Sequence, residues 1–274
     1  MQSVIFFIVY FFSCLSFANI PFEIPRSTVI ELKEPATDRT YPLFIKLPRS
    51  YSSNPDRKYP VIYLTDSWYS FQTVSGATRF PMNSGAMEEA IIVAISYSKG
   101  SQGASSRIRD YTPRKTSDWK METGNAPGHA KFIRDLVFPY IETKFRADPL
   151  QRTFIGNSLG GLFGAYMLFN NPDMFSSYII GSPSVWFNDD YILSAAVIKS
   201  ETPIKVYISV GSLEKPEFGG REDMVSGAKK LAVKIAEQSG ANISLKFSII
   251  EGARHATSFP TTSIQGLDWI YGKL

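Results

Sequence analysis

The feature that most constrains the fold is a glycine-rich stretch at residues 152–161, which reads Arg-Thr-Phe-Ile-Gly-Asn-Ser-Leu-Gly-Gly. The β-forming residues near its start predict a strand, and apolar residues at 162–168 recur at helical spacing. A G-x-S-x-G sequence between a strand and a helix places its serine, here Ser158, at the apex of a sharp turn. Gly156 and Gly160 lack the Cβ atoms that would collide with neighbouring elements in so tight a turn. We interpret Ser158 as a nucleophile at a helix N-terminus; the alternative is an ordinary glycine-rich turn.

Apolar segments that alternate with helical patterns predict an α/β fold around this turn. Fully apolar strands indicate a parallel sheet covered on both faces, whereas the first two strands are expected to be antiparallel. The predicted strands are residues 28–32, 41–47, 59–64, 90–95, 153–155, 177–181, 204–210 and 243–250, and the predicted helices are 130–145, 162–168, 222–238 and 263–271. We therefore predict a doubly wound, mostly parallel sheet with helices on both faces, and functional residues at the carboxyl ends of its strands.

Two segments are expected to depart from this regular pattern. Residues 100–128 have little apolar periodicity and are rich in Ser, Arg, Thr and Gly. So long a connection is usually functional or disordered, and we expect a loop that crosses the rim of the active site. Pro139 should kink the predicted helix at 130–145.

The N-terminal residues predict an exported protein. Residues 1–18 carry no charged side chain, and the stretch 4–17 is nearly continuously apolar. We interpret 1–18 as a secretory signal peptide and 19–274 as a single domain, which predicts a periplasmic or secreted location. The alternative is a retained membrane anchor, although the apolar run is short for a full span. The only cysteine, Cys14, lies in this leader, which excludes disulfides, thiolate catalysis and cysteine-based metal sites in the mature chain.

The charge pattern bears on the expected partners. The net charge of +4 is compatible with an anionic substrate, but the basic residues are scattered and form no run. We therefore expect no nucleic-acid binding and, once the leader is cleaved, no association with a membrane.

A serine hydroxyl is a weak nucleophile until a base accepts its proton. The chain holds only two histidines. His255 follows the last predicted strand, where the base of a doubly wound hydrolase lies, and is the preferred general base. His129 begins a predicted helix, where a solvated or capping role is the simpler interpretation, and it remains the alternative base.

The histidine needs a carboxylate that holds its tautomer and supports the imidazolium. In this fold the chain order is serine, acid, histidine. Glu214 is the first acidic residue after the strand that ends at residue 210, and it is the preferred acid. Glu217 and Asp223 remain candidates, as does a Ser–His dyad in which Glu214 is only an exposed loop residue.

Backbone N–H groups are expected to hold the oxyanion that develops on the substrate. One should come from Leu159, directly after the nucleophile, and the other from the loop that follows the strand at 59–64. Trp68 or Ser67 can supply the second donor. The Trp68 side chain is expected to be a hydrophobic lid residue, which is compatible with donation by its backbone.

Several segments together resemble the putative-esterase family of α/β-hydrolases. They are Tyr-Pro-Val-Ile-Tyr-Leu-Thr-Asp at 59–66, Ile-Gly-Asn-Ser-Leu-Gly-Gly-Leu at 155–162, Gly-Ser-Pro-Ser-Val-Trp-Phe at 181–187 and the late Arg-His pair. That family includes the enterobactin-type and bacillibactin-type siderophore esterases, and is related to S-formylglutathione hydrolase and the mycolyltransferases. The resemblance runs from about residue 30 to residue 274.

The resemblance implies roles for individual residues. It implies Ser158 as nucleophile, His255 as base, Glu214 as acid and Trp68 as an oxyanion donor. The segment Arg-Ile-Arg-Asp-Tyr-Thr-Pro at 107–113 is similar to a family segment that contacts an aromatic acyl group.

Arg107 is therefore the implied substrate-binding residue, and the alternative is an Arg–Asp pair that only pins the loop. Trp186 is either a wall of the pocket or part of the core. The chain departs from the family at two positions. Asn157 stands where histidine is usual, which need not affect the mechanism, and Ser67 stands in the expected oxyanion loop where glycine is common.

The sequence thus predicts an exported serine esterase that needs neither a metal nor an organic cofactor and acts on a small-molecule ester. An ester of a siderophore or of an aromatic acid is the candidate substrate. An acyltransferase with the same triad is the nearest alternative. A non-catalytic binding protein on a hydrolase scaffold is an alternative from another class, and a missing triad member would be its signature.

Overall fold

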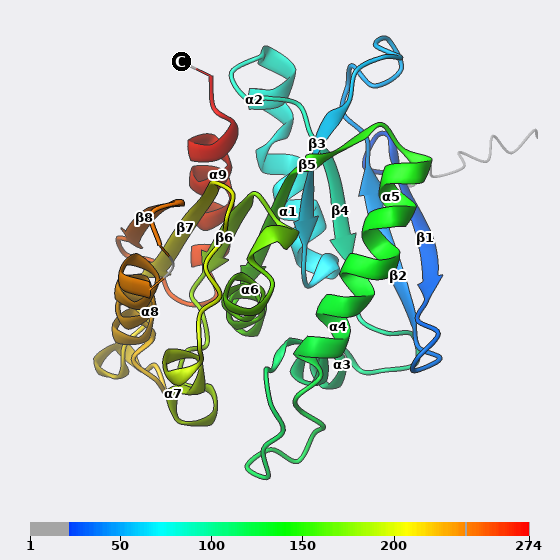
Figure 1. The fold of residues 1–274 in the computed structure, drawn as a ribbon. Helices are drawn as coiled ribbons and strands as arrows, with labels where there is room; N and C mark the ends of the chain where they lie inside the picture. The colour runs from blue at the N-terminus through cyan, green and yellow to red at the C-terminus, as the bar shows by residue number, and fades with distance from the viewer. Residues whose placement is uncertain (1–21, 239, 274) are drawn as a thin grey trace, which may run out of the picture.

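The computed structural model describes residues 22–238 and 240–273, and the predicted leader at 1–18 lies outside the described residues. Eight strands form one sheet in the order β1-β2-β4-β3-β5-β6-β7-β8 (Figure 1). Their bounds are β1 Ser27–Lys33, β2 Thr40–Lys46, β3 Tyr59–Leu64, β4 Ile91–Ile95, β5 Ala147–Asn157, β6 Ser177–Gly181, β7 Ile204–Gly211 and β8 Ile243–Ile250. The pairs β1–β2 and β2–β4 are antiparallel, and the other pairs are parallel. The predicted α/β fold with a mostly parallel sheet is confirmed.

Helices cover both faces of this sheet (Figure 1). They are α1 Ser67–Ala77, α2 Arg79–Ser84, α3 Gly103–Tyr111, α4 Ala126–Phe132, α5 Phe138–Lys144, α6 Leu159–Asn170, α7 Phe187–Ser194, α8 Met224–Gln238 and α9 Ser258–Tyr271. Strand β3 separates two cores, because successive residues of a strand point to opposite faces. Val61 and Tyr63 belong to the cluster under α4, α6 and α8, whereas Ile62 and Leu64 belong to the cluster under α1 and α9. Within the described residues, no helix is long and apolar enough to cross a membrane.

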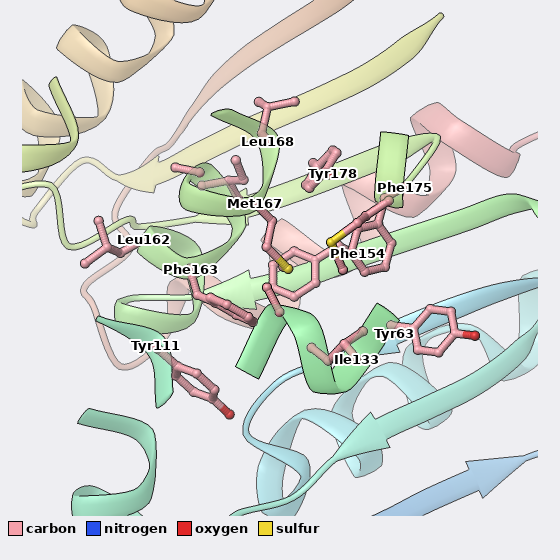
Figure 2. Packing of buried hydrophobic residues seen from close by; sticks show 14 of the residues in the cluster. Tyr63, Tyr111, Ile133, Phe154, Leu162, Phe163, Met167, Leu168, Phe175 and Tyr178 are labelled. Atoms are coloured by element: carbon pink, nitrogen blue, oxygen red, sulfur yellow. The ribbon is translucent and has the colours of Figure 1, made fainter. Parts of the chain in front are cut away.

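Aromatic rings are packed together in the larger of the two cores (Figure 2). Phe154 of β5 meets Phe163 of α6 edge-on, with ring centroids 6.0 Å apart, and its ring centroid lies 5.5 Å from that of Phe175. All three side chains are buried. Because each ring buries a large apolar surface, these contacts hold α6 firmly against the sheet.

Two segments differ from the sequence-based expectation. Residues 100–128 contain the helix α3, where we expected a loop; its sequence is polar, and its stability comes from burial of Ile108 and Tyr111 and from ionic contacts that the apolar pattern does not reveal. The helix predicted at 130–145 consists of α4, a π-helical turn at Ile133–Val137 and α5. The turn lies just before Pro139, whose ring and missing N–H disrupt a regular helix. The helices α1, α2 and α7 were not predicted.

We predict opposite effects for two glycine-to-alanine changes in helices. A Cβ atom at Gly266 of α9 would lie 2.8–3.0 Å from side-chain atoms of Ile179 on β6, whereas one at Gly76 of α1 would meet no described atom within 4 Å. Gly266→Ala should therefore lower the free energy of unfolding by roughly 1–3 kcal/mol through overpacking. Gly76→Ala should raise it by about 0.5–1 kcal/mol through helix propensity. Urea unfolding of both variants checks this, and a stabilised Gly266→Ala protein would contradict the close contact between α9 and β6.

Candidate active site

Ser158 lies at the turn between β5 and α6, with φ 60° and ψ −120°. This conformation is strained for a residue with a side chain, and it persists only where the surroundings hold it. A Cβ atom at Gly156 would overlap the Gly160 carbonyl, and one at Gly160 would lie 2.5 Å from Thr65 Oγ1. The Ser158 N–H donates to the Gly181 carbonyl at 3.0 Å. Close packing and backbone hydrogen bonding thus fix the serine at the carboxyl edge of the sheet.

Glu214 and His255 come together beyond the ends of β7 and β8. His255 Nδ1 lies 2.6 Å from Glu214 Oε2, and the Glu214 side chain is buried while about half of the imidazole is exposed. β7 and β8 are neighbouring parallel strands, so the loops after them leave the sheet at the same edge. This distance fits an Nδ1–H that donates to the carboxylate and leaves Nε2 free to accept a proton.

The Glu214 carboxylate accepts hydrogen bonds from three donors. Besides the imidazole, Ser182 Oγ donates to Oε1 at 2.6 Å and the Gly211 N–H donates to Oε1 at 2.8 Å. Burial alone would raise the pKa of Glu214, but the hydrogen bonds from His255, Ser182 and Gly211 outweigh it and lower the pKa below its usual value. The carboxylate is therefore ionised at neutral pH, as a group that supports an imidazolium must be.

One cavity of about 450 Å³ brings these side chains together. Ser158, Glu214 and His255 all line it, with Trp186 and Ser184 beside them. Ser158 Oγ lies 3.2 Å from Ser184 Oγ, and this is its one side-chain hydrogen bond among the described residues. Catalytic hydrogen bonds are often long without substrate and tighten when it binds.

The other candidate acids and the other histidine lie in different surroundings. Glu217 is exposed and pairs with Lys215 at 3.2 Å, and Asp223 accepts the Ser226 N–H at 2.9 Å near the start of α8. His129 is buried among aromatic rings instead of being solvated, and burial lowers its pKa. It does not line the cavity of Ser158.

The expected oxyanion donors lie at two adjacent helix starts. Leu159 is the first residue of α6, and Trp68 is the second residue of α1, whose preceding loop touches the Gly160 position through Thr65. N–H groups in the first turn of a helix have no acceptor inside the helix, so they are available to an anion. The Trp68 side chain is 65% exposed, packs edge-on against Phe44 and does not line the cavity of Ser158.

Arg107 is engaged by a carboxylate of the protein itself. Its Nε and one terminal nitrogen donate to the two oxygens of Asp66 at 2.9 and 3.2 Å, and the Tyr97 hydroxyl donates to the same carboxylate at 2.8 Å. Asp66 precedes α1 and is buried. Arg107 therefore ties α3 to the loop that precedes α1, and it does not line the cavity of Ser158.

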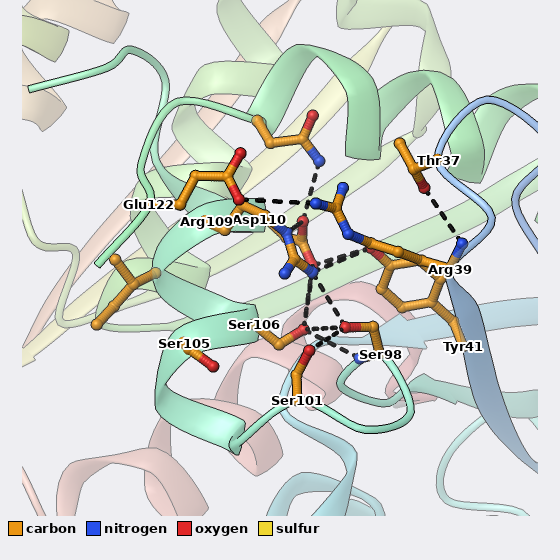
Figure 3. A network of polar contacts seen from close by, with 12 residues as sticks. Thr37, Arg39, Tyr41, Ser98, Ser101, Ser105, Ser106, Arg109, Asp110 and Glu122 are labelled. Carbon is orange, nitrogen blue, oxygen red and sulfur yellow. Dashed lines mark hydrogen bonds and ion pairs between the residues drawn. The ribbon is translucent and has the colours of Figure 1, made fainter.

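A second buried ion pair lies within α3 itself and contacts the sheet through Tyr41 (Figure 3). An Arg109 guanidinium nitrogen lies 2.7 Å from Asp110 Oδ2, and the hydroxyls of Tyr41 and Ser106 donate to the same oxygen at 3.1 Å. Tyr41 belongs to β2. The Tyr41 hydroxyl thus attaches this ion pair of α3 to β2, in addition to the apolar contacts of the helix, and Arg107 projects from a fixed support.

Sequence reasoning missed three residues of this region. Trp119 stacks on Trp186, with centroids 6.1 Å apart and planes inclined by 11°, so the segment at 100–128 does reach a wall of the cavity. Ser182 contacts Glu214, and Ser184 contacts Ser158. The signals for the serines were their place directly after a strand that ends beside the Ser158 turn and the segment 181–187 that carries the family resemblance. Within residues 22–238 and 240–273, no cluster of His, Cys, Asp and Glu could hold a metal ion.

The comparisons with known proteins identify the family. The family model described as "Putative esterase" matches residues 35–256. The chain belongs to this family. It is 32% identical over 259 residues to the ferri-bacillibactin esterase BesA of Bacillus subtilis strain 168, with 87% of each chain covered.

Solved structures agree with this assignment. The BES protein from Bacillus cereus has a TM-score of 0.80 and 29% identity, covering 94% of this chain and 98% of its own. The siderophore hydrolase EstB from Aspergillus nidulans has a TM-score of 0.79 and 23% identity, and the match covers 93% of this chain and 98% of EstB. The protein is therefore a carboxylic ester hydrolase with the α/β-hydrolase fold.

We predict that Arg107 stabilises this esterase whether or not substrate is present. Arg107→Gln leaves the buried Asp66 carboxylate without its guanidinium partner, which should lower the free energy of unfolding by roughly 3 kcal/mol. The control Arg114→Gln changes an exposed arginine of the same segment, and it should change the free energy of unfolding by less than about 0.5 kcal/mol. Urea unfolding of both variants decides, and equal stability would return Arg107 to a role in substrate binding alone.

Proposed function

We propose that this protein is an exported serine esterase in which Ser158, His255 and Glu214 form the catalytic triad. The observation that carries the proposal is the 2.6 Å contact between His255 Nδ1 and the buried Glu214, in a cavity that Ser158 also lines. A nucleophile at a strained turn, a histidine with a free ring nitrogen and an ionised orienting acid are the groups that acyl transfer requires.

The proposed mechanism has two steps. Ser158 Oγ attacks the ester carbonyl while His255 Nε2 accepts the hydroxyl proton, and Glu214 holds the imidazolium by its Nδ1–H. The backbone N–H groups of Leu159 and Trp68 stabilise the oxyanion. The imidazolium then protonates the departing alcohol, which completes the first step. In the second step water attacks the acyl carbon and gives a proton to His255, and the imidazolium returns that proton to Ser158 Oγ as the acyl–serine bond breaks and the acid leaves.

We propose an ester of a siderophore or of an aromatic acid as the substrate. Trp186, Phe218 and Met224 offer apolar contacts in the cavity, and its walls also carry Arg254 and the pair of Arg221 with Glu222. The apolar side chains suit an aromatic acyl group, and the guanidinium groups can contact the face of its ring. The activities in the names of the relatives, a ferri-bacillibactin esterase among them, support the same choice. Hydrolysis rates on matched catecholate, feruloyl and short-chain alkyl esters test it, and a preference for the alkyl ester would contradict it.

We predict that removing the charge of Glu214 slows the reaction without weakening substrate binding. Glu214→Gln keeps volume and hydrogen bonding but permits the wrong tautomer of His255, so kcat should fall roughly 10²- to 10⁴-fold with KM little changed. Glu217→Gln and Asp223→Asn should each change kcat by less than about tenfold, because these side chains lie outside the histidine contact. Steady-state kinetics on one ester compares the three variants.

Ser158→Ala provides the reference for complete loss. It should abolish both hydrolysis and labelling by a fluorophosphonate probe while circular dichroism remains unchanged. Labelling that survives this substitution would refute Ser158 as the nucleophile, and a crippled Asp223→Asn protein would refute Glu214 as the acid.

We also propose that the leader is removed during export. The uncharged, apolar residues 1–18 motivate this. Expressed with its leader in a bacterial host, the protein should be found outside the cytoplasm with an N-terminus near Asn19. N-terminal sequencing that finds Met1 on membrane-bound protein would favour a retained anchor.

A further inference from the structure

A second cavity, of about 550 Å³, lies at the opposite edge of the sheet from Ser158. Lys46 lines it at the end of β2 and pairs with Ile92 near the start of β4. Because β2 is antiparallel to β4, its last residues lie at the amino edge of the parallel strands, whereas Ser158 follows the carboxyl end of β5. The two cavities share no lining residue.

The charged residues that line this cavity are all basic. They are Arg26, Lys46, Arg49 and Arg79. Within residues 22–238 and 240–273, none of the four forms an ion pair with a carboxylate. The preceding residues 1–21 contain no Asp or Glu that could supply one. Four cations thus converge without a counter-charge from the side chains around them.

Lys46 is the deepest of these cations. It is only 7% exposed, and its ammonium donates one long hydrogen bond, 3.4 Å, to the Ser75 carbonyl in the last turn of α1. An ammonium group can donate three hydrogen bonds, so this single contact leaves its other N–H groups without a partner among the described residues. Burial, with the nearby charges of Arg26 and Arg79, lowers the pKa of Lys46 to about 8. A buried cation among like charges is costly unless an anion compensates it.

A purely structural role explains only part of this arrangement. A lysine near the last carbonyls of a helix is favoured by the helix dipole, which accounts for Lys46 beside Ser75. Arg26 donates to the Leu47 carbonyl at 3.2 Å. Neither contact accounts for Arg49 and Arg79, which are exposed at the same cavity and add repulsion to it.

We propose that the cavity lined by Arg26, Lys46, Arg49 and Arg79 binds a phosphate group. Guanidinium groups match the oxygens of phosphate with paired donors, and a lysine ammonium adds a compact charge. The multiple negative charge of phosphate suits four cations better than a single carboxylate does.

The phosphate group could belong to a soluble phosphate compound or to a lipid. Phe22 at the cavity and Phe80 in the adjoining hollow are 89% and 79% exposed, and such apolar side chains can enter a membrane surface beside a headgroup. Both sources present the same chemistry to the basic residues.

Titration calorimetry of the full chain with inorganic phosphate, at constant ionic strength and pH 7, tests the site. We expect one phosphate per chain, and Arg49→Gln and Arg79→Gln should each weaken binding about tenfold or more. Lys229→Gln removes the same charge from an exposed position on α8 and should leave the affinity unchanged. Ester hydrolysis should be the same in all of these variants, so loss of this site and loss of the proposed triad are distinguishable.

Vesicles of phosphatidylcholine, with and without phosphatidylglycerol, distinguish the two sources. Binding that requires phosphatidylglycerol, is lost in Arg79→Gln and is displaced by phosphate would assign a lipid headgroup. Phosphate binding with no preference between the vesicles would assign a soluble compound. If phosphate and anionic vesicles both fail to bind, or bind equally to Arg49→Gln, Arg79→Gln and Lys229→Gln, the proposal is overturned.

Discussion

The edge of the sheet that carries the candidate active site depends on close approaches that only glycine permits. The missing Cβ of Gly160 brings the first turn of α6 against Thr65 beyond β3, and that of Gly156 lets β5 pass beneath the Gly160 carbonyl. The Ser158 N–H is held by Gly181 at the end of β6. The turn is therefore joined to three neighbouring strands at once. A strained serine of this kind costs about 1–3 kcal/mol and persists because the surroundings over-determine it.

Much of this edge could be predicted from the sequence because strand ends are local signals. Apolar runs locate the strands, and the polar residues just beyond them must gather at one edge when the strands are parallel. Glu214 and His255 each lie a few residues past such a run, and the structure places them 2.6 Å apart. The expected chain order of serine, acid and histidine also helps the prediction, because it limits the candidate acids to those between Ser158 and the histidine.

The rest could not be predicted because it depends on contacts between distant segments. The helix α3 has little apolar periodicity, and it is fixed by Asp66, from the loop after β3, and by Tyr41, from β2. The stacking of Trp119 on Trp186 joins residues that are far apart in the chain. The basic cavity is equally hidden, because its four cations come from the residue before β1, from β2, from the turn after β2 and from α2, and no run of charge marks them. Each of these features appears only when the topology brings the segments together.

Three of the buried carboxylates near the carboxyl edge differ in the role they can play: two only stabilise the structure, and one can support proton transfer. Asp66, Asp110 and Glu214 each accept several hydrogen bonds, because a buried charge is stable only when it is paired or hydrogen-bonded. The cation beside Asp66 or Asp110 is an arginine, which does not lose its proton in proteins. Those pairs can hold α3 and its loops, but they cannot pass a proton to a substrate.

Of these three carboxylates, only Glu214 has a hydrogen-bond contact with a histidine among the described residues, and histidine is the side chain that exchanges a proton near neutral pH. The half-exposed imidazole also opens onto the cavity of Ser158. The arginine–aspartate pairs therefore hold α3 and its neighbouring loops in place. The His255–Glu214 pair, which can exchange a proton, lies at the cavity where the proposed acyl transfer needs it.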